Sequence, residues 1–211
     1  MQPRTTDIRA GVPDASSIHK AALAHLARYA TTRASLTAVL DRRVRRWADH
    51  AARSAADPEL IAAAARELEQ TVRAIVARLA EAGLVDDRAF AEGRSRRLVR
   101  AGRSRTAILV HLAAKGVART IAEASLPADE DTELLAALAF ARRRRCGPFQ
   151  RDPDSPANES SRTRALAAFS RAGFGRGTAC RALDMSPEEA ISRLRGIDPN
   201  GPGNGGRQGP E

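Results

Sequence analysis

Apolar side chains recur every seven residues between positions 61 and 79, and this spacing constrains the fold more than any other feature of the 211-residue chain. The seam consists of Ile61, Ala65, Leu68, Val72, Ile75 and Leu79. A heptad pattern predicts one long helix that packs along a partner helix. A helix start lies just upstream of the seam at Asp57, Pro58 and Glu59, with a capping aspartate, a proline in the first turn and an acid after it.

A second apolar stripe lies upstream and predicts the partner helix. It consists of Leu36, Leu40, Val44 and Trp47, and the helix that carries it should begin near Thr32 and run past Ala51. We expect the two helices to fold back on each other as an antiparallel hairpin.

The remaining chain is also predicted to be helical. Alanine is abundant and β-branched residues are sparse, which favours helix over strand. Helix stops recur at Gly83, Gly102, Gly116 and Pro127. Further helices should begin near Ser16 or Ser17, Asp86, Ser104, Val117, Asp129, Ser161, Phe174 and Ser186. The sequence therefore predicts an all-α protein.

Two blocks of the chain match each other at a constant offset of 57 residues, 105–126 and 162–183. A weaker, earlier copy has Leu36 and Leu40 in place of Ile108 and Leu112. The chain is therefore predicted to contain three tandem three-helix repeats, each too small to bury a core alone. The predicted segments are a disordered tail at 1–16, a first repeat at 17–86 with the long hairpin inserted, a second at 87–127, a third at 128–195, and a disordered tail at 196–211.

The charge balance is strongly basic. The chain has 35 Lys and Arg residues against 25 Asp and Glu residues, a net charge of +10, which favours attraction to polyanions. Only Lys20 and Lys115 are lysines. A GC-rich genome and bidentate contacts to phosphate or carboxylate both account for an arginine excess of this kind.

The basic residues are concentrated, since no acid occurs from Gly93 to Ala122. A one-signed run through two helices and a turn predicts a surface that faces a polyanion. The candidate contacts to a partner or to nucleic acid are Arg94, Arg96, Arg97, Arg100, Arg103, Arg105, Lys115, Arg119, Arg142, Arg143, Arg162, Arg164, Arg171 and Arg176.

Nothing in the sequence predicts a catalytic, metal or cofactor site. The histidines and the two cysteines, Cys146 and Cys180, lack metal-ligand spacing, and two cysteines fit a reducing compartment. Asp86 and Asp87 follow a helix-ending glycine, so we interpret them as capping residues. No apolar run is long enough to span a membrane, and residues 1–13 lack the apolar core of a signal peptide. We expect a cytoplasmic monomer that is not an enzyme.

The order of these motifs resembles the RecX family of recombinase regulators. The residues that carry the resemblance are Ala22 to Ala30, Arg33 to Leu40, Gly83 to Glu92, Arg96 to Gly102, Ile108 to Leu112, Lys115 to Val117, Ile121, Leu126, Ala172 to Phe174, and Ala182 with Leu183. Arg94 and Ser95 depart from it, since family members often have apolar residues there, and the stretch from about Trp47 to Glu69 is an insertion relative to a compact member.

The resemblance implies an elongated, curved array of helical repeats that binds the RecA recombinase on DNA. Family members limit the growth of the RecA filament and its ATPase and strand-exchange activities, and have no catalytic residues of their own. The alternative is a basic DNA-binding protein that uses helix-turn-helix-like units. The basic segments contain almost no Asn or Gln to read base edges, which favours backbone or protein contacts.

Overall fold

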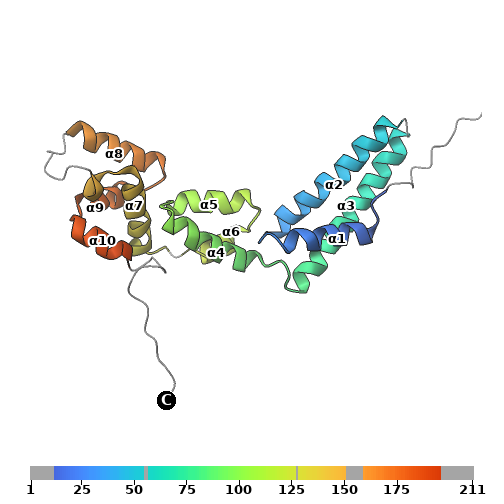
Figure 1. The fold of residues 1–211 in the computed structure, drawn as a ribbon, viewed down its shortest axis with the longest axis horizontal. Coiled ribbons are helices and arrows are strands. Elements are labelled where there is room, and N and C mark those ends of the chain that lie inside the picture. The colour runs from blue at the N-terminus through green and yellow to red at the C-terminus, as the bar shows by residue number, and fades with distance from the viewer. Residues whose placement is uncertain (1–11, 55–56, 127, 151–158, 196–211) are drawn as a thin grey trace, which may run out of the picture. The chain divides into compact units, whose positions relative to one another are not determined.

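The computed structural model describes residues 12–54, 57–126, 128–150 and 159–195, and within them the fold is entirely helical (Figure 1). The α-helices are α1 (Ala15–Leu26), α2 (Arg33–Arg53), α3 (Pro58–Glu81), α4 (Asp87–Arg100), α5 (Arg105–Ala114), α6 (Arg119–Ala124), α7 (Glu130–Arg144), α8 (Glu159–Arg171), α9 (Arg176–Asp184) and α10 (Pro187–Arg195), and the 3-10 helix η1 spans Gly147–Phe149. The prediction of an all-α protein is confirmed. The predicted tails fall mostly at 1–11 and 196–211, outside the described residues.

Two helix starts differ from their predictions. The carboxylate of Asp14 accepts the Ser17 N–H at 2.7 Å, so α1 begins at Ala15 and its cap is neither of the predicted serines. Residues 15 and 16 therefore belong to a helix and not to a tail. Helix α8 already includes Glu159, an acid that suits a helix N-terminus, so Ser161 lies inside the helix and is not its cap.

Two further helices start later than predicted. Val117 lies outside α6, which begins at Arg119. In the same way, Phe174 lies just before α9, which begins at Arg176 after Gly175. Its ring is buried among those of Phe140 and Phe169, and this packing fixes its place in the connection.

The described chain divides into two compact units. Unit 1 comprises residues up to Phe90 together with Ala114–Ala118, and unit 2 comprises Ala91–Ala113 and the residues from Arg119 onward. This division into two units does not test the residue boundaries of the three repeats, which stay a prediction.

The predicted hairpin forms the core of unit 1. Leu36, Leu40 and Val44 of α2 are buried with the α3 seam residues Leu68, Val72, Ile75 and Leu79, while Trp47 and Ala65 pack against them half-buried. Burying a large apolar side chain contributes roughly 1.5–3 kcal/mol, so this seam is the main support of α2 and α3. The hairpin prediction is confirmed.

Unit 2 is built around α7. Leu134 and the whole stretch from Ala136 to Ala141 are buried, and the alanines allow neighbouring backbones to approach closely. The ring of Phe140 lies 4.8 Å from that of Phe169, centroid to centroid. A Cβ on Gly102 would lie 2.5 Å from the Phe140 backbone nitrogen, and the φ of Gly102 is +69°. Only glycine fits where the end of α4 crosses α7.

Unit 1 contains a distinctive contact at the start of α2, which we call the first joint. The Thr32 hydroxyl accepts the Ser35 N–H at 3.0 Å, which caps α2, and donates to the Lys115 carbonyl at 2.5 Å. Gly116 follows with a φ of +73°, and a Cβ there would collide with Ala34. The Asp87 carboxylate accepts the Arg33 N–H at 2.8 Å.

Unit 2 contains the same arrangement at the start of α5, the second joint. The Ser104 hydroxyl accepts the Ala107 N–H at 3.2 Å and donates to the Ala172 carbonyl at 2.6 Å. Gly173 follows with a φ of +85°, and its Cβ would lie 2.8 Å from the Ser104 hydroxyl oxygen. The Glu133 carboxylate accepts the Arg105 N–H at 2.9 Å. One set of bonds thus occurs twice, once in each unit.

Candidate nucleic-acid interface

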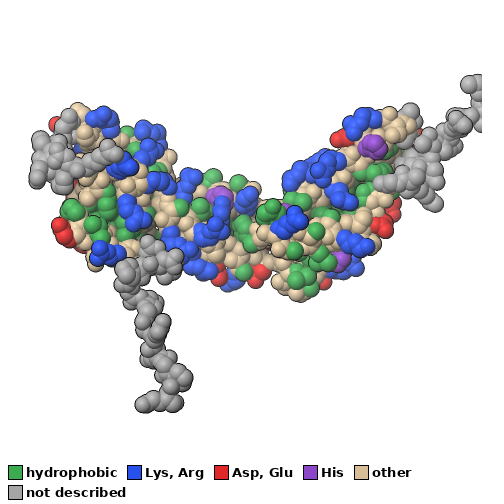
Figure 2. Space-filling model, viewed as in Figure 1, with side chains coloured by type: hydrophobic (Ala, Val, Ile, Leu, Met, Phe, Trp, Pro, Cys, Tyr) green, Lys and Arg blue, Asp and Glu red, His purple; other side chains and the backbone are tan. Residues whose placement is uncertain are grey.

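The predicted basic residues are unevenly divided between the units. Lys115 lies in unit 1 and all the others lie in unit 2. One exposed group lies on α4 and the loop after it, namely Arg96, Arg97, Arg100 and Arg103, and Figure 2 shows Lys and Arg side chains over this helix.

The packing of α4 explains which arginines are exposed. Ala91 and Ser95 are buried, and the Ser95 hydroxyl lies 3.4 Å from that of Ser125. Residues three or four apart share a helix face, so this buried face turns Arg96 and Arg100 toward solvent. Neither of the two forms an ion pair with any carboxylate of the described chain.

The C-terminal ends of α4 and α7 meet and bring their arginines together. The Arg143 guanidinium donates to the Ala101 carbonyl at 2.6 Å, directly after the last residue of α4. The guanidinium carbons of Arg143 and Arg144 lie 5.6 and 5.5 Å from the centre of the Phe140 ring, within cation–π range. Cations also complement the helix dipole here, so these arginines have a structural role at this end. Arg144 is not among the contacts predicted from the sequence, because the buried ring beneath it is visible only in the fold.

Several predicted residues are engaged inside the fold. The Asp184 carboxylate pairs with both terminal nitrogens of Arg162, at 2.5 and 3.0 Å, and this holds the pKa of Asp184 below its usual value. Arg119 pairs with Glu123 at 2.8 Å. Arg94 donates to the His111 Nε2 at 3.0 Å.

Two further predicted residues bond within the fold. Arg164 donates to the Ser160 carbonyl of its own helix, and Arg105, whose backbone N–H donates to Glu133, is half-buried. Arg142, Arg171 and Arg176 are exposed like the α4 group. The exposed group and the engaged group therefore differ in what they offer a partner, and the predicted interface stays a prediction.

Two acids at the start of α7 are paired with arginines of the last two helices. Arg181 of α9 pairs with Glu130 at 2.8 Å, and Arg193 of α10 lies 3.6 Å from Asp131. These contacts attach the acidic start of α7 to the last two helices, so the acids are offset by arginines outside the predicted interface.

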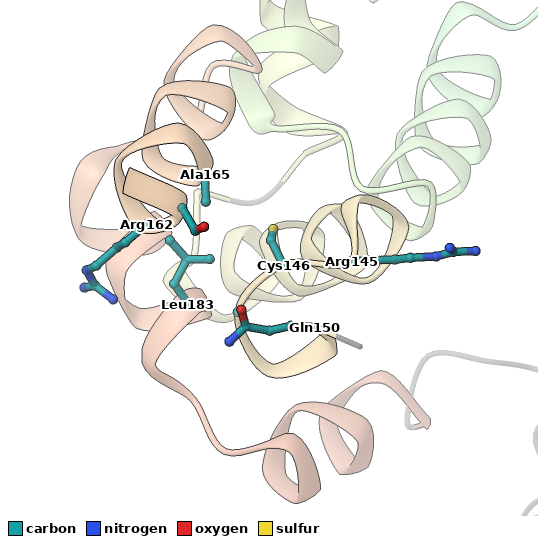
Figure 3. Close-up of a pocket in the computed structure, with 8 residues that line it drawn as sticks. Arg145, Cys146, Gln150, Arg162, Ala165 and Leu183 are labelled. Atoms are coloured by element: carbon teal, nitrogen blue, oxygen red, sulfur yellow. The ribbon is translucent and has the colours of Figure 1, made fainter. Parts of the chain in front are cut away.

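A pocket of about 210 Å³ lies between the end of α7, η1, α8 and α9 (Figure 3). Arg145 and Arg162 line it, but their side chains extend away from each other and out of it (Figure 3). Burial raises the pKa of the Cys146 thiol, which favours its protonated form. The described residues contain no cluster of three or more metal-ligating side chains.

None of the described helices combines the length and the hydrophobicity needed to span a bilayer.

Fold and charge together define a class: an arginine-rich protein built from successive three-helix sets, with a basic helix in the second of them. The family model described as "RecX, second three-helix domain" matches residues 86–126, which hold α4 to α6. The chain is 35% identical over 175 residues to the regulatory protein RecX of Myxococcus xanthus, covering 81% of this chain and 86% of that protein. It is 38% identical over 107 residues to the regulatory protein RecX of Agrobacterium fabrum, covering 50% and 55%. No solved structure matches.

The chain belongs to the RecX family, as its sequence motifs implied.

Proposed function

We propose that this protein binds the RecA filament on DNA and limits its ATPase and strand-exchange activities. The relatives bear the name regulatory protein RecX, which supports a regulatory role and no catalysis. The observation that carries the proposal is the exposed, unpaired arginine group of α4 within the segment that matches the family. The protein would act as a cytoplasmic monomer.

The arginine group supplies the electrostatic part of this binding. Arg96, Arg97 and Arg100 repel one another on one helix, and a polyanion relieves that repulsion. Phosphate contacts of this kind release counterions, so affinity falls steeply with salt. The group offers no Asn or Gln for base edges, which favours binding that does not depend on sequence.

A charge-reversal experiment tests the assignment. Arg96→Glu, Arg97→Glu and Arg100→Glu together should abolish inhibition of RecA-dependent ATP hydrolysis and strand exchange on single-stranded DNA. The matched control is Arg66→Glu, Arg73→Glu and Arg78→Glu, which makes the same charge change at exposed positions of α3. The control should inhibit like the wild type.

Two results would count against the proposal. If folded wild-type protein at equimolar RecA leaves both activities unchanged, the regulatory assignment is wrong. If the protein instead prefers one duplex sequence and ignores RecA, a helix-turn-helix DNA-binding protein is the better description.

A further inference from the structure

Exposed arginines of α2 form a second basic surface. Four of the five residues from 42 to 46 are arginines, Arg42, Arg43, Arg45 and Arg46, and all four are exposed. Figure 2 shows Lys and Arg side chains gathered along the α2 side of the hairpin. We call these four residues the α2 arginine row. They are not among the residues predicted from the sequence as contacts.

The hairpin fixes the direction of this row. Leu40 and Val44 are buried against α3, and Trp47 is half-buried on the same side. Each residue of an α-helix is rotated by about 100° from the previous one, which turns Arg42, Arg45 and Arg46 to the opposite side. Arg42 and Arg46 are about 6 Å apart along the helix axis, since each residue rises 1.5 Å. The long seam therefore holds the row on a rigid support.

Nothing else in the described chain accounts for the α2 arginine row. All five ion pairs of the described residues lie in unit 2, and none involves these four residues. The row lies in the middle of a 21-residue helix, too far from its C-terminus to complement the helix dipole as Arg142 and Arg143 do on α7. Like charges three and four residues apart destabilise a helix. A bound anion would relieve the repulsion between arginines such as Arg42 and Arg46.

The neighbouring acids offset the row only in part, because Arg45 alone of the four acts on the Asp41 carboxyl. Asp41 is half-buried toward α3, where burial and the nearby Glu69 raise the pKa of its carboxyl. Asp49 is exposed beyond the row and forms no ion pair with it. The positive charge of the row is thus directed to solvent.

We propose that the α2 arginine row binds the sugar–phosphate backbone of a nucleic-acid strand and gives unit 1 an interface of its own. This goes beyond the proposed function, which assigns the phosphate contacts to unit 2. Guanidinium groups bind phosphate in a bidentate manner, and a line of cations on a rigid helix fits a repeating line of anions.

An acidic protein surface is the competing partner, and the make-up of the face argues against it. Protein interfaces are anchored by buried aromatic or large apolar side chains at their centres. The exposed large apolar residues of unit 1 are Leu23, Tyr29, Leu60 and Leu84, and none lies on α2. The face is charged without an apolar anchor, which is typical of backbone binding to nucleic acid.

Binding of full-length protein to a fluorescently labelled oligo(dT) strand, measured by anisotropy over a salt series, tests the proposal. The row variant carries Arg42→Gln, Arg45→Gln and Arg46→Gln. The control carries Arg66→Gln, Arg73→Gln and Arg78→Gln on α3, with the same charge change. The two sets are well matched, because each contains one arginine, Arg45 or Arg73, that acts on the Asp41 carboxyl.

The row variant should reduce the slope of log K against log salt by roughly 2, at about 0.7 per phosphate contact on a single strand. From about 50 to 200 mM salt, the wild-type Kd should therefore rise roughly 16-fold more than that of the row variant. The control should keep the wild-type slope. Far-UV circular dichroism and thermal unfolding check each fold, and the series Arg42→Lys, Arg45→Lys and Arg46→Lys keeps the charge and should retain most of the slope.

A third variant separates this inference from the proposed function. Arg96→Gln, Arg97→Gln and Arg100→Gln remove charge from unit 2 only. If the row variant loses slope and this variant does not, the row is an interface and the unit 2 assignment fails. The inference is overturned if the row variant keeps the wild-type slope. It is also overturned if the lysine series loses as much slope as the row variant, because the slope then does not depend on charge at these positions. It is also overturned if the row variant binds oligo(dT) normally but no longer inhibits RecA, since the row then faces a protein.

Discussion

The two joints perform one task with different residues. In each, a hydroxyl at a helix start caps its own helix and binds the carbonyl before a glycine that lies far along the chain. In each, an acid accepts the first N–H of that helix. The first joint uses Thr32 and Asp87, and the second uses Ser104 and Glu133.

The difference between the joints lies in side-chain length and burial. Asp87 is the first residue of α4 and reaches the Arg33 N–H with a short side chain. Glu133 lies in the second half of the first turn of α7, so a longer side chain is needed to reach the Arg105 N–H. Burial raises the pKa of Glu133. A backbone arrangement can thus be kept while the residues that satisfy it change.

The largest expected effect comes from adding a Cβ at the glycine of each joint. Gly116→Ala should destabilise the protein by about 2–5 kcal/mol. The left-handed φ should cost about 1–2 kcal/mol of this, and the collision of the new Cβ with Ala34 about 1–3 kcal/mol. Gly173→Ala should cost less, because the hydroxyl it meets can rotate, although it then loses its bond to Ala172. Urea unfolding followed by circular dichroism measures both.

Gly83→Ala is the control for these two substitutions. Its φ is +72°, but a Cβ there would meet nothing within 4 Å. It should therefore show the cost of the φ alone. If Gly116→Ala costs no more than Gly83→Ala, the close packing of the first joint is not what stabilises it.

Removing the hydroxyls should have the next largest effect. Thr32→Ala and Ser104→Ala each delete a cap and leave a carbonyl without its donor, which should cost about 1–3 kcal/mol. Thr37→Ala is the control, since the Thr37 hydroxyl bonds only the Arg33 carbonyl of its own helix. Hydrogen exchange of the first-turn amides of α2 and α5 should rise only in the matching variant. Equal exchange in both helices would mean that the joints are not independent.

The swapped hydroxyls refine this result. Thr32→Ser keeps the bond and should be milder than Thr32→Ala. Ser104→Thr adds a methyl group beside Gly173, where space is short, and should destabilise unit 2. If both swaps are neutral, side-chain size does not distinguish the joints.

Much of this fold could be predicted from local signals. The seam of α3, the start at Asp57 and the stops at Gly83, Gly102 and Gly116 all follow from short-range patterns, and the structure confirms the hairpin. The first turns of α1 and α8 could not be placed, because several candidate caps stood side by side. The strongest acceptor decided α1, and that choice is visible only in the geometry.

The two joints contain contacts that the sequence alone could not predict. Thr32 and Ser104 are separated by 72 residues, as are Leu36 and Ile108, so the hydroxyls follow the repeat and could have been paired. Asp87 and Glu133 are 46 residues apart and share no such offset. Their equivalent roles depend on which backbone N–H each carboxylate contacts in the folded protein. In the same way, the sequence located the basic segments but not which arginines the fold already uses, such as Arg162.

The smallest expected effect distinguishes the two acids by pH. In the folded protein, burial outweighs the Arg105 N–H and the Arg105 charge, which lower the pKa of Glu133, so this pKa is raised. The folded state then binds the proton more tightly than the unfolded state, and stability from this group is lost as pH rises through the raised pKa. Glu133→Gln should therefore stabilise the protein at pH 7, by up to about 1 kcal/mol since the side chain is partly solvated. The gain should vanish below about pH 4.5, where glutamate is protonated in both states.

Asp87→Asn should act in the opposite direction at pH 7, costing about 0.3–1 kcal/mol, because a charge is lost at the N-termini of α2 and α4. Thermal unfolding of both variants and the wild type from pH 4 to 7 measures this, and a shift of the same sign in both would mean that the joints do not differ in how they hold their acids.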